Sequence, residues 1–346
     1  MADRFFKPGM SIAEIKKVFP FAKHANMVSV SRLQTFSDCT LKHDFKYKHK
    51  LKDSTKYYLT RGMVFHECMN EMLLDKSLTL KQILEFAAEK WIEAKKAGLP
   101  VGDYKTKESD VLKQITTSLS IYYERLHTGL DSHYLFDYDM KNGKVVKTAE
   151  MEFRIPIVDI ETMEDLGYDW DIYGAIDEFS WSSEYAVAVI DHKLHSRAYK
   201  DFAVDTSLQL GIYAYAIKYL WKSGCFPEIK EKQISKIKTG FNSFRTCSLS
   251  TNPKGIQFEF LRDSYDDAKI KATINIVAAK IKAIESGIVY PSFNDECTWK
   301  CGFNKPCQML RNGKDISEYI KENRRVYDTE EKTSILSLVI DEEEAF

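Results

Sequence analysis

Residues 171–193, DIYGAIDEFSWSSEYAVAVIDHK, decide the fold. The first half is typical of a strand, residues 182–184 suggest a turn, and the apolar run that follows is typical of a buried strand ending on polar residues. We therefore expect a β-hairpin here. Because side chains alternate between the two faces of a strand, Lys193 shares a face with Asp191, and Asp177 on the neighbouring strand can converge with Asp191.

Two carboxylates and a lysine in this arrangement suit the hydrolysis of a phosphodiester. That reaction needs a hard cation that binds a non-bridging oxygen and lowers the pKa of the attacking water, and a further positive charge near the reacting centre. Asp177 and Asp191 can bind the cation, and Lys193 can supply the charge. In an arbitrary protein an Asp-x-Lys sequence is more often a strand end facing solvent, so the rest of the chain decides between the two interpretations.

The hairpin lies within an alternation of helical and extended patterns. Residues 31–75 and 80–130 have helical spacing, and residues 149–155 change to a period of two, which starts the sheet. After the hairpin, a helix from residue 205 places Gln209 and Tyr213 on one face. Two strand-like segments and a last helix follow, at 234–244, 256–260 and 264–286. The pattern predicts an α/β fold.

Composition excludes several classes of protein. The 346 residues are 44% apolar and 29% charged, which is typical of a folded globular chain rather than a disordered, collagen-like or coiled-coil one. The longest apolar run is far shorter than the ~20 residues of a membrane-spanning helix, and the N-terminus lacks the apolar core of a secretory signal. We expect no membrane association and a cytoplasmic location, or the host cytoplasm if the protein is viral.

Charge is balanced overall, with 50 Lys and Arg against 51 Asp and Glu, but it is unevenly distributed. Residues 42–61 carry seven Lys or Arg against two Asp, interleaved with aromatic residues, which suits nucleic-acid binding or packing equally. The chain ends in the acidic sequence DEEEAF at 341–346. This tail is either a solubilising end or a polyanion mimic that occupies the nucleic-acid site or docks a protein partner.

Three of the seven cysteines form a C-x3-C-x5-C run at Cys297, Cys301 and Cys307. Cytosolic thiols stay reduced, so metal binding is a better explanation than disulfides. Four thiolates suit a [4Fe–4S] cluster or structural zinc, and the spacing alone leaves both open. A fourth ligand is required.

The order of short motifs resembles the RecB-like branch of the PD-(D/E)XK nucleases over about residues 31–310. It is most similar to the iron–sulfur members, which are the AddB nuclease domain and the CRISPR-associated RecB-like exonucleases. The matching segments are SRLQTFSDCTLKHDFKYKHKL (31–51), RGMVFHECMNEML (61–73), YGAIDEFSW (173–181), AVIDHKL (188–194) and LQLGIYAYA (208–216).

This resemblance implies a set of metal ligands and a catalytic lysine. His66, Asp177, Asp191 and the main-chain carbonyl of His192 would bind Mg²⁺ or Mn²⁺, and Lys193 would position or activate the attacking water. Without the other motifs, His66 would be interpreted as a packed histidine in a helix.

The resemblance also implies supporting residues. Gln209 and Tyr213 would contact the DNA backbone or support the site, although an amphipathic helix with two polar positions explains them equally well. An acid from the strand before the hairpin often joins the metal site in this family. Glu150 and Glu152 fall on one face of that strand, and the sequence does not choose between them.

For the cysteines, the resemblance implies that Cys39 is the fourth ligand, joined to Cys297, Cys301 and Cys307 across the whole nuclease core. It favours a [4Fe–4S] cluster, with zinc as the alternative occupant. The spacing C-x3-C departs from the C-x2-C that the family more often has. The remaining cysteines, Cys68, Cys225 and Cys247, are interpreted as unliganded.

The predicted architecture is a PD-(D/E)XK restriction-endonuclease-like core with a mixed central sheet, a helical insertion and a C-terminal Fe–S cluster staple. Its parts are an N-terminal arm at 1–30, a nuclease domain at 31–312 with a helical subregion at 62–135, a sheet core at 149–290 and a cluster segment at 297–307, and an extension at 313–346. The implied activity is two-metal-type hydrolysis of DNA by an exonuclease acting on single strands or ends. The alternatives are a non-catalytic nucleic-acid-binding scaffold and a partner-activated subunit of a recombination or CRISPR-adaptation complex.

Overall fold

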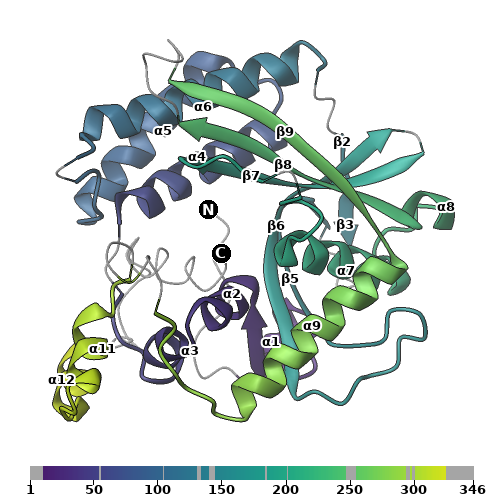
Figure 1. The fold of residues 1–346 in the computed structure, drawn as a ribbon. Coiled ribbons are helices and arrows are strands. Elements are labelled where there is room, and N and C mark those ends of the chain that lie inside the picture. The colour runs from purple at the N-terminus through teal and green to yellow at the C-terminus, as the bar shows by residue number, and fades with distance from the viewer. Residues whose placement is uncertain are drawn as a thin grey trace.

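The computed structural model describes residues 11–53, 56–103, 105–130, 134–139, 145–183, 185–200, 202–246, 255–293, 297 and 301–324. Within these residues the fold is α/β, built on a mixed seven-stranded sheet with helices packed against it (Figure 1). The expected turn residues 141–144, Cys247 and the acidic tail at 341–346 lie outside the described residues.

The main sheet has a path of five strands, and two further strands pair with β6. Its strands are β1 (Asn26–Ser29), β2 (Tyr134–Leu135), β5 (Ala149–Pro156), β6 (Trp170–Ser183), β7 (Ala186–His195), β8 (Lys236–Thr246) and β9 (Ile256–Asp266). A separate two-stranded sheet consists of β3 (Asp137–Asp139) and β4 (Val145–Lys147). The predicted hairpin is therefore present as the antiparallel pair β6 and β7.

The helices fall into three groups along the chain. The N-terminal group is α1 (Ile12–Val18), α2 (Val30–Asp38), α3 (Thr40–His43) and the π-helical turn η1 (Asp44–Lys48). The helical subregion is α4 (Tyr57–Leu74), α5 (Leu80–Lys96) and α6 (Glu108–His127). The C-terminal half holds α7 (Leu208–Lys222), α8 (Glu231–Ile234), α9 (Asp267–Glu285), α11 (Asn304–Arg311) and α12 (Ser317–Asn323).

Strand β6 pairs with two different strands along one of its edges, and the gap between them is where the site forms. On that edge β1 pairs in parallel with Trp170–Tyr173, and β7 pairs with Glu178–Ser183, while β5 pairs along the opposite edge. Residues 174–177 therefore lie between the two partners, with no paired residue on this edge in the described chain. The sheet splits here, and β7, β8 and β9 run toward α4–α6 while β5 and β6 run toward α1 and α2 (Figure 1).

One face of the sheet packs against α7 and α9 to form the main core. The α7 sequence LQLGIYAYAIKYLWK is apolar almost all round, as expected of a buried helix. Gly211 on α7 allows a close approach, because a Cβ atom there would lie 2.5 Å from Oγ1 of Thr273 on α9. Helix α7 therefore packs closely on α9, and it also contacts β5, β7 and β8.

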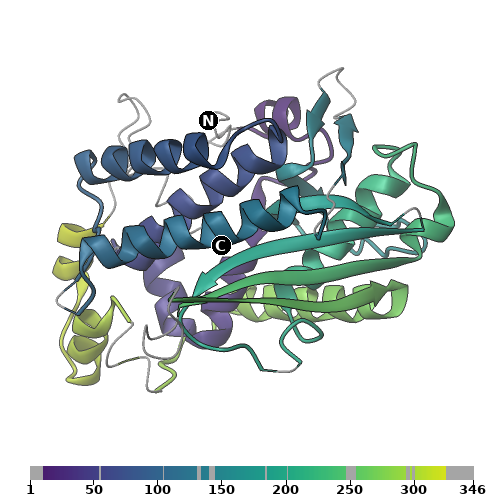
Figure 2. The same ribbon diagram turned by 90° about the horizontal axis from the view of Figure 1, so that it is seen from above.

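The helical subregion forms a second core at the other end of the sheet. Helices α4, α5 and α6 pack together and contact β7 and β9 (Figure 2). Their shared core includes Trp91 and Tyr122 from the helices and Phe244 and Ile256 from the strands. The helices expected at 80–130 are present as α5 and α6, whereas the helical pattern from 31 to 75 is interrupted. Cys39 ends α2 and caps α3, since its Sγ accepts a hydrogen bond from the Lys42 N–H over 3.4 Å.

The segment expected as a polar arm contains ordered elements from residue 11 onward. Ser11 and Glu14 form a capping box at the start of α1, and β1 joins the sheet. A buried ion pair anchors the segment: Arg154 Nε lies 3.1 Å from Asp171 Oδ2, and both side chains are fully buried. The carboxylate of Asp171 also accepts from the N–H groups of Lys23 and His24. Sequence periodicity missed these elements because both are short.

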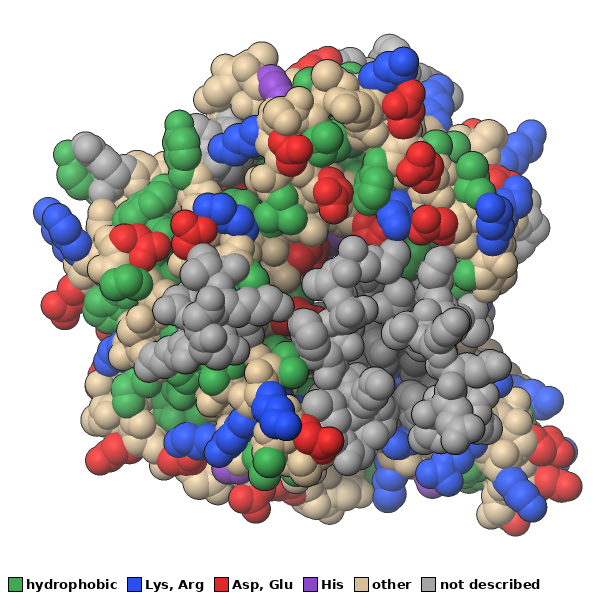
Figure 3. Space-filling view, turned by 180° about the vertical axis from the view of Figure 1, so that it is seen from behind, with side chains coloured by type: hydrophobic (Ala, Val, Ile, Leu, Met, Phe, Trp, Pro, Cys, Tyr) green, Lys and Arg blue, Asp and Glu red, His purple; other side chains and the backbone are tan. Residues whose placement is uncertain are grey.

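The surface carries charge of both signs. On the face in Figure 3, Lys and Arg side chains are interspersed with Asp and Glu over the described part. Among the described helices, none combines the length and the apolar character needed to cross a bilayer.

Candidate active site and cysteine cluster

Asp177 lies at the open edge of β6, next to the last residue paired with β7. Its side chain is 2% exposed, and its Oδ2 accepts a hydrogen bond of 2.7 Å from the main-chain N–H of His192. Burial raises the pKa of Asp177 well above its ordinary value, and the neighbouring Asp191 and Glu150 add to the effect, while His66 opposes it. A group of carboxylates buried together in this way is stabilised by a bound cation.

Helix α4 brings His66 onto these acids. Nδ1 of His66 lies 3.4 Å from Oδ2 of Asp177 and 3.5 Å from Oε1 of Glu150. One ligand atom from each of the three residues lies within 4.8 Å of the other two. Burial would lower the pKa of His66, but the charges of Asp177 and Glu150 outweigh it and raise that pKa to about 9.

The structure distinguishes Glu150 from Glu152. Glu150 has a φ of +46°, in the left-handed region that non-glycine residues rarely adopt, and it stands opposite Asp177 between two regular strand pairs. This irregularity directs its carboxylate to His66. Glu152 instead accepts a hydrogen bond of 2.9 Å from the Tyr173 hydroxyl. A strained residue at a cluster of acids is typical of a functional site.

The Asp-x-Lys segment lies on β7, where the pairing with β6 has just ended. Nζ of Lys193 lies 2.9 Å from Oδ2 of Asp191, which is fully buried, and Lys193 is about one quarter exposed. Burial alone would lower the pKa of Lys193, but Asp191 and Asp177 raise it above its ordinary value. Lys193 is therefore a cation throughout the physiological pH range.

Helix α7 contributes Tyr213 and Gln209, as its spacing predicts. Gln209 Nε2 donates to the Tyr213 hydroxyl over 2.9 Å. Burial raises the pKa of Tyr213 well above its ordinary value, and the charges of the neighbouring Asp191 and Asp177 raise it further. Both residues lie at the site and bond to each other.

His192 contributes to the site through its main chain. Its N–H donates to Asp177, whereas its side chain is buried on the other face of β7, beside Glu178 and Asn242.

Sequence reasoning missed Tyr199, whose ring stacks on Phe241 with centroids 5.0 Å apart. Burial raises the pKa of Tyr199, and the charges of Lys193 and Asp191 also act on it. Its position in an irregular segment gave no periodic signal.

The cysteines that the sequence singles out lie in one region. Cys39, Cys301 and Cys307 pack against an apolar cluster that includes Phe45 and Phe303. Burial raises the pKa of the Cys307 thiol, and the charges of Cys39 and Cys297 raise it further.

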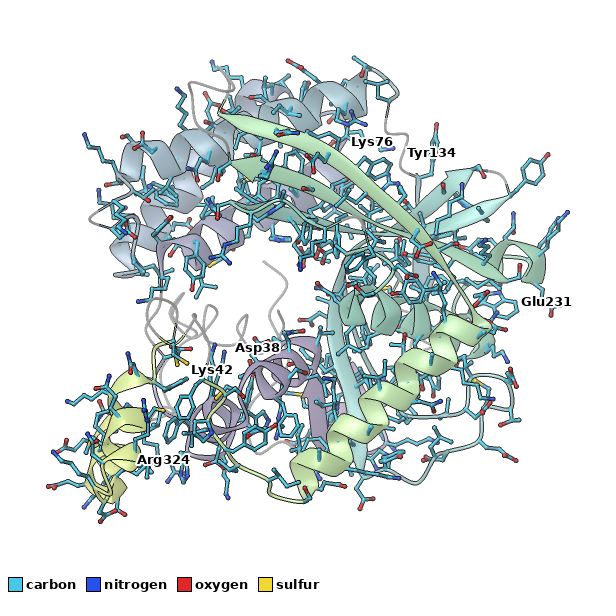
Figure 4. All side chains as sticks on the ribbon, in the orientation of Figure 1. Asp38, Lys42, Lys76, Tyr134, Glu231 and Arg324 are labelled. Carbon is cyan, nitrogen blue, oxygen red and sulfur yellow. The ribbon has the colours of Figure 1, made fainter. Side chains whose placement is uncertain are left out.

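Hydrogen bonds tie this region to α3 and to the segment before the cysteine run. Ser292 links two of the sulfurs, because its N–H donates to Cys39 Sγ over 3.4 Å and its carbonyl accepts from Cys297 Sγ over 3.5 Å. Figure 4 labels Lys42, on α3, and Arg324, which follows α12 and pairs with Leu51 in an isolated bridge. Segments from the N-terminal and C-terminal parts of the chain therefore meet here.

The basic segment at 42–61 is divided between packing and surface. Phe45 is 1% exposed and packs on Phe303, 5.8 Å between ring centroids, and Lys46 is buried. Tyr58 is exposed. At least part of this segment therefore surrounds the cysteines.

Two Asp and a Lys carried by a mixed sheet, with a His from helix α4 beside them, form the arrangement expected of the nucleases built on the restriction-endonuclease core. The chain belongs to the PD-(D/E)XK nuclease superfamily, whose family model matches residues 27–308. Among curated proteins, none matches this chain closely enough to count as a relative.

Two solved structures are similar to this chain at low sequence identity. A proposed exonuclease from Eubacterium rectale is 12% identical, with a TM-score of 0.45 over 90% of this chain and 92% of that one. The protein SSO0001 is 15% identical, with a TM-score of 0.28 over 82% of this chain and 86% of that one.

Proposed function

We propose that this protein is a metal-dependent deoxyribonuclease of the RecB-like iron–sulfur branch, an exonuclease that acts on single-stranded DNA or on DNA ends. The observation that carries the proposal is the convergence of His66, Glu150 and Asp177 at the open edge of β6, within 4.8 Å of one another. Asp191 and Lys193 adjoin them on β7. Family membership supports the class of reaction.

In this proposal, His66, Glu150, Asp177 and Asp191 hold Mg²⁺ or Mn²⁺, with the carbonyl of His192 as a further ligand. The carboxylate and carbonyl oxygens are the donors that suit these hard cations, and burial and the neighbouring Asp191 and Glu150 raise the pKa of Asp177, as expected of a site that a cation would stabilise. When bound, the metal lowers the pKa of the attacking water and neutralises charge on the phosphate.

Three further residues, Lys193, Gln209 and Tyr213, act on the phosphate, on the water or on the acids themselves. Lys193, which pairs with Asp191, is placed to stabilise negative charge on the scissile phosphate and to position or activate the attacking water. Gln209 donates to the Tyr213 hydroxyl beside the acids, which supports the geometry of the site. Tyr213 is fully buried, so the half-buried Gln209 is the residue of the two that can contact the DNA backbone.

We further propose that Cys39, Cys297, Cys301 and Cys307 hold a structural [4Fe–4S] cluster. Support for this donor set is that Cys39, Cys301 and Cys307 pack against the same apolar cluster, and that N–H groups of Lys42 and Ser292 donate to Cys39 Sγ, as at a thiolate that ligates a cluster. The family resemblance favours the cluster, and structural zinc is the alternative occupant.

The direct test compares cleavage of a linear single-stranded oligonucleotide, labelled at either end, with cleavage of a circular single strand. The protein is purified without oxygen and supplied with Mg²⁺ or Mn²⁺, and Asp191→Ala is the matched inactive variant. We expect stepwise products from the linear strand, no cleavage of the circle and none by the variant. Cleavage of the circle would contradict an exonuclease. No cleavage of either by a protein with an intact cluster would favour a non-catalytic scaffold or a subunit that needs a partner.

A further inference from the structure

A buried group of polar side chains lies directly behind the acid site. Glu178 follows Asp177 in the sequence, and His192 stands between Asp191 and Lys193, so alternation along the strands turns Glu178 and His192 to the other face of the sheet. There, Nε2 of His192 lies 3.6 Å from Oε2 of Glu178, and the two side chains are 1% and 0% exposed.

Three further residues hold this pair, and together the five are called the rear cluster. Ser180 Oγ donates to Glu178 Oε1 over 2.6 Å, and the Tyr122 hydroxyl of α6 donates to Oε2 over 3.4 Å. Asn242 Nδ2 on β8 lies 3.1 Å from His192 Nδ1. When this amide donates, the imidazole carries its proton on Nε2, which faces Glu178. The Tyr122 ring packs against the His192 ring at 5.3 Å.

The rear cluster is connected to the acid site through the backbone. The last paired residues of β6 and β7 are Glu178 and Ile190, and the strands diverge beyond them. His192 then bridges the strands twice: its N–H donates to Asp177 over 2.7 Å, and its side chain reaches Glu178. Any shift of His192 therefore moves the Asp177 carboxylate relative to Asp191.

We infer that His192 and Glu178 are positioning residues, and that the rear cluster sets the metal affinity of the site by fixing the distance between β6 and β7 where Asp177 and Asp191 meet the cation. This inference rests on the proposed metal site. Burying two polar side chains of this kind costs desolvation free energy. A contribution to stability therefore does not by itself explain their presence. Groups that orient metal ligands typically account for 10–100-fold in metal affinity.

The test is calorimetric titration of Mn²⁺ into the full chain, stripped of divalent cations, with no nucleic acid present. His192→Phe keeps a ring against Tyr122 but removes both nitrogens, whereas Glu178→Gln keeps the shape and an acceptor. Tyr215→Phe is the control, because it removes a buried hydroxyl that bonds to the carbonyl of Pro156 in the core, away from the acids. Thermal unfolding is measured on every variant.

We expect His192→Phe to weaken Mn²⁺ binding about tenfold or more, Glu178→Gln to stay within a few-fold of the parent, and Tyr215→Phe to lower Tm without changing the affinity. If His192→Phe does not fold, Tyr122→Phe should weaken binding by a few-fold. Parent-like affinity in His192→Phe (or in Tyr122→Phe, if His192→Phe does not fold), or equal weakening in Tyr215→Phe, would overturn the inference. A parent that binds no Mn²⁺ would contradict the proposed function itself. Asp191→Ala, which removes a proposed ligand, is the reference for absent binding.

Discussion

Oε1 of Glu150 lies 3.5 Å from Nδ1 of His66, which joins the start of strand β5 to the middle of helix α4. The contact depends on the left-handed backbone of Glu150, whose φ is +46°. It brings the helical subregion and the sheet together at the acids, so the geometry of the site depends on both.

The first prediction separates the two glutamates that the sequence leaves open. Glu150→Gln should weaken Mn²⁺ binding and cleavage by more than about tenfold, since even groups that only support metal ligands cost that much. Glu152→Gln should change either quantity little, because Glu152 bonds to Tyr173 instead. Titration calorimetry and initial cleavage rates measure both. Equal losses in the two variants would contradict the assignment of Glu150 to the metal site.

The second prediction concerns pH in the metal-free protein. His66 has a pKa of about 9 in the folded protein, raised from an unfolded value of about 6.5. Its charged form therefore contributes stability that is fully present below about pH 6.5 and is lost as pH rises through about 9. The Tm should fall over this interval, and His66→Gln should show a flatter profile.

Metal binding should follow the same titration in the opposite sense. The imidazole must lose its proton to bind a cation, so Mn²⁺ affinity should increase between pH 6.5 and 9, with protons released on binding. Calorimetry in buffers of different ionisation enthalpy detects these protons. A pH-independent affinity would remove His66 from the ligand set.

The third prediction tests the cysteine cluster. Cys39→Ala should lower the iron content per chain and the Tm, because one of four ligands that join distant ends of the chain is lost. Cys225→Ala is the matched control, since Cys225 is fully buried in the main core. Elemental analysis of anaerobically purified protein decides the outcome. Zinc in place of iron would identify the alternative occupant, and undiminished metal in Cys39→Ala would contradict the ligand set.

The fourth prediction concerns the anchor of the N-terminal segment. Asp171→Ala leaves Arg154 without its carboxylate partner in a fully buried position, so unfolding should become easier by about 3–5 kcal/mol. Glu85→Ala, which breaks the exposed pair with Lys81, should cost about 0.5 kcal/mol or less. Urea unfolding of the two variants measures both values. Similar costs would mean that Asp171 does not anchor the segment.

Much of the fold follows from local sequence patterns. The hairpin was predictable because β6 and β7 are adjacent in the chain and are separated by a short turn, and α7 because Gln209 and Tyr213 interrupt an apolar helix at a spacing of four. The order of the remaining strands was not predictable, because β1 and β7 share one edge of β6 through contacts far apart in sequence.

The limits on predicting the site are equally specific. Alternation places Glu150 and Glu152 on one face, and only the left-handed φ of Glu150, set by its tertiary surroundings, separates them. His192 was expected to act through its carbonyl. The role of its side chain depends on Asn242 and Tyr122, which lie on distant segments. Spacing carries no information about such contacts.

The most direct measurement of the central claim is the first-turnover rate of Mn²⁺-dependent cleavage of an end-labelled single strand by Lys193→Met. Lys238→Met is the matched control, because Lys238 is an exposed lysine on the adjacent strand, bonded to Ser182. We predict that Lys193→Met lowers the rate by about 10²–10³-fold with unchanged DNA binding, while Lys238→Met cleaves like the parent. Equal rates in the two variants would show that the site around Asp177 and Asp191 does not carry the reaction.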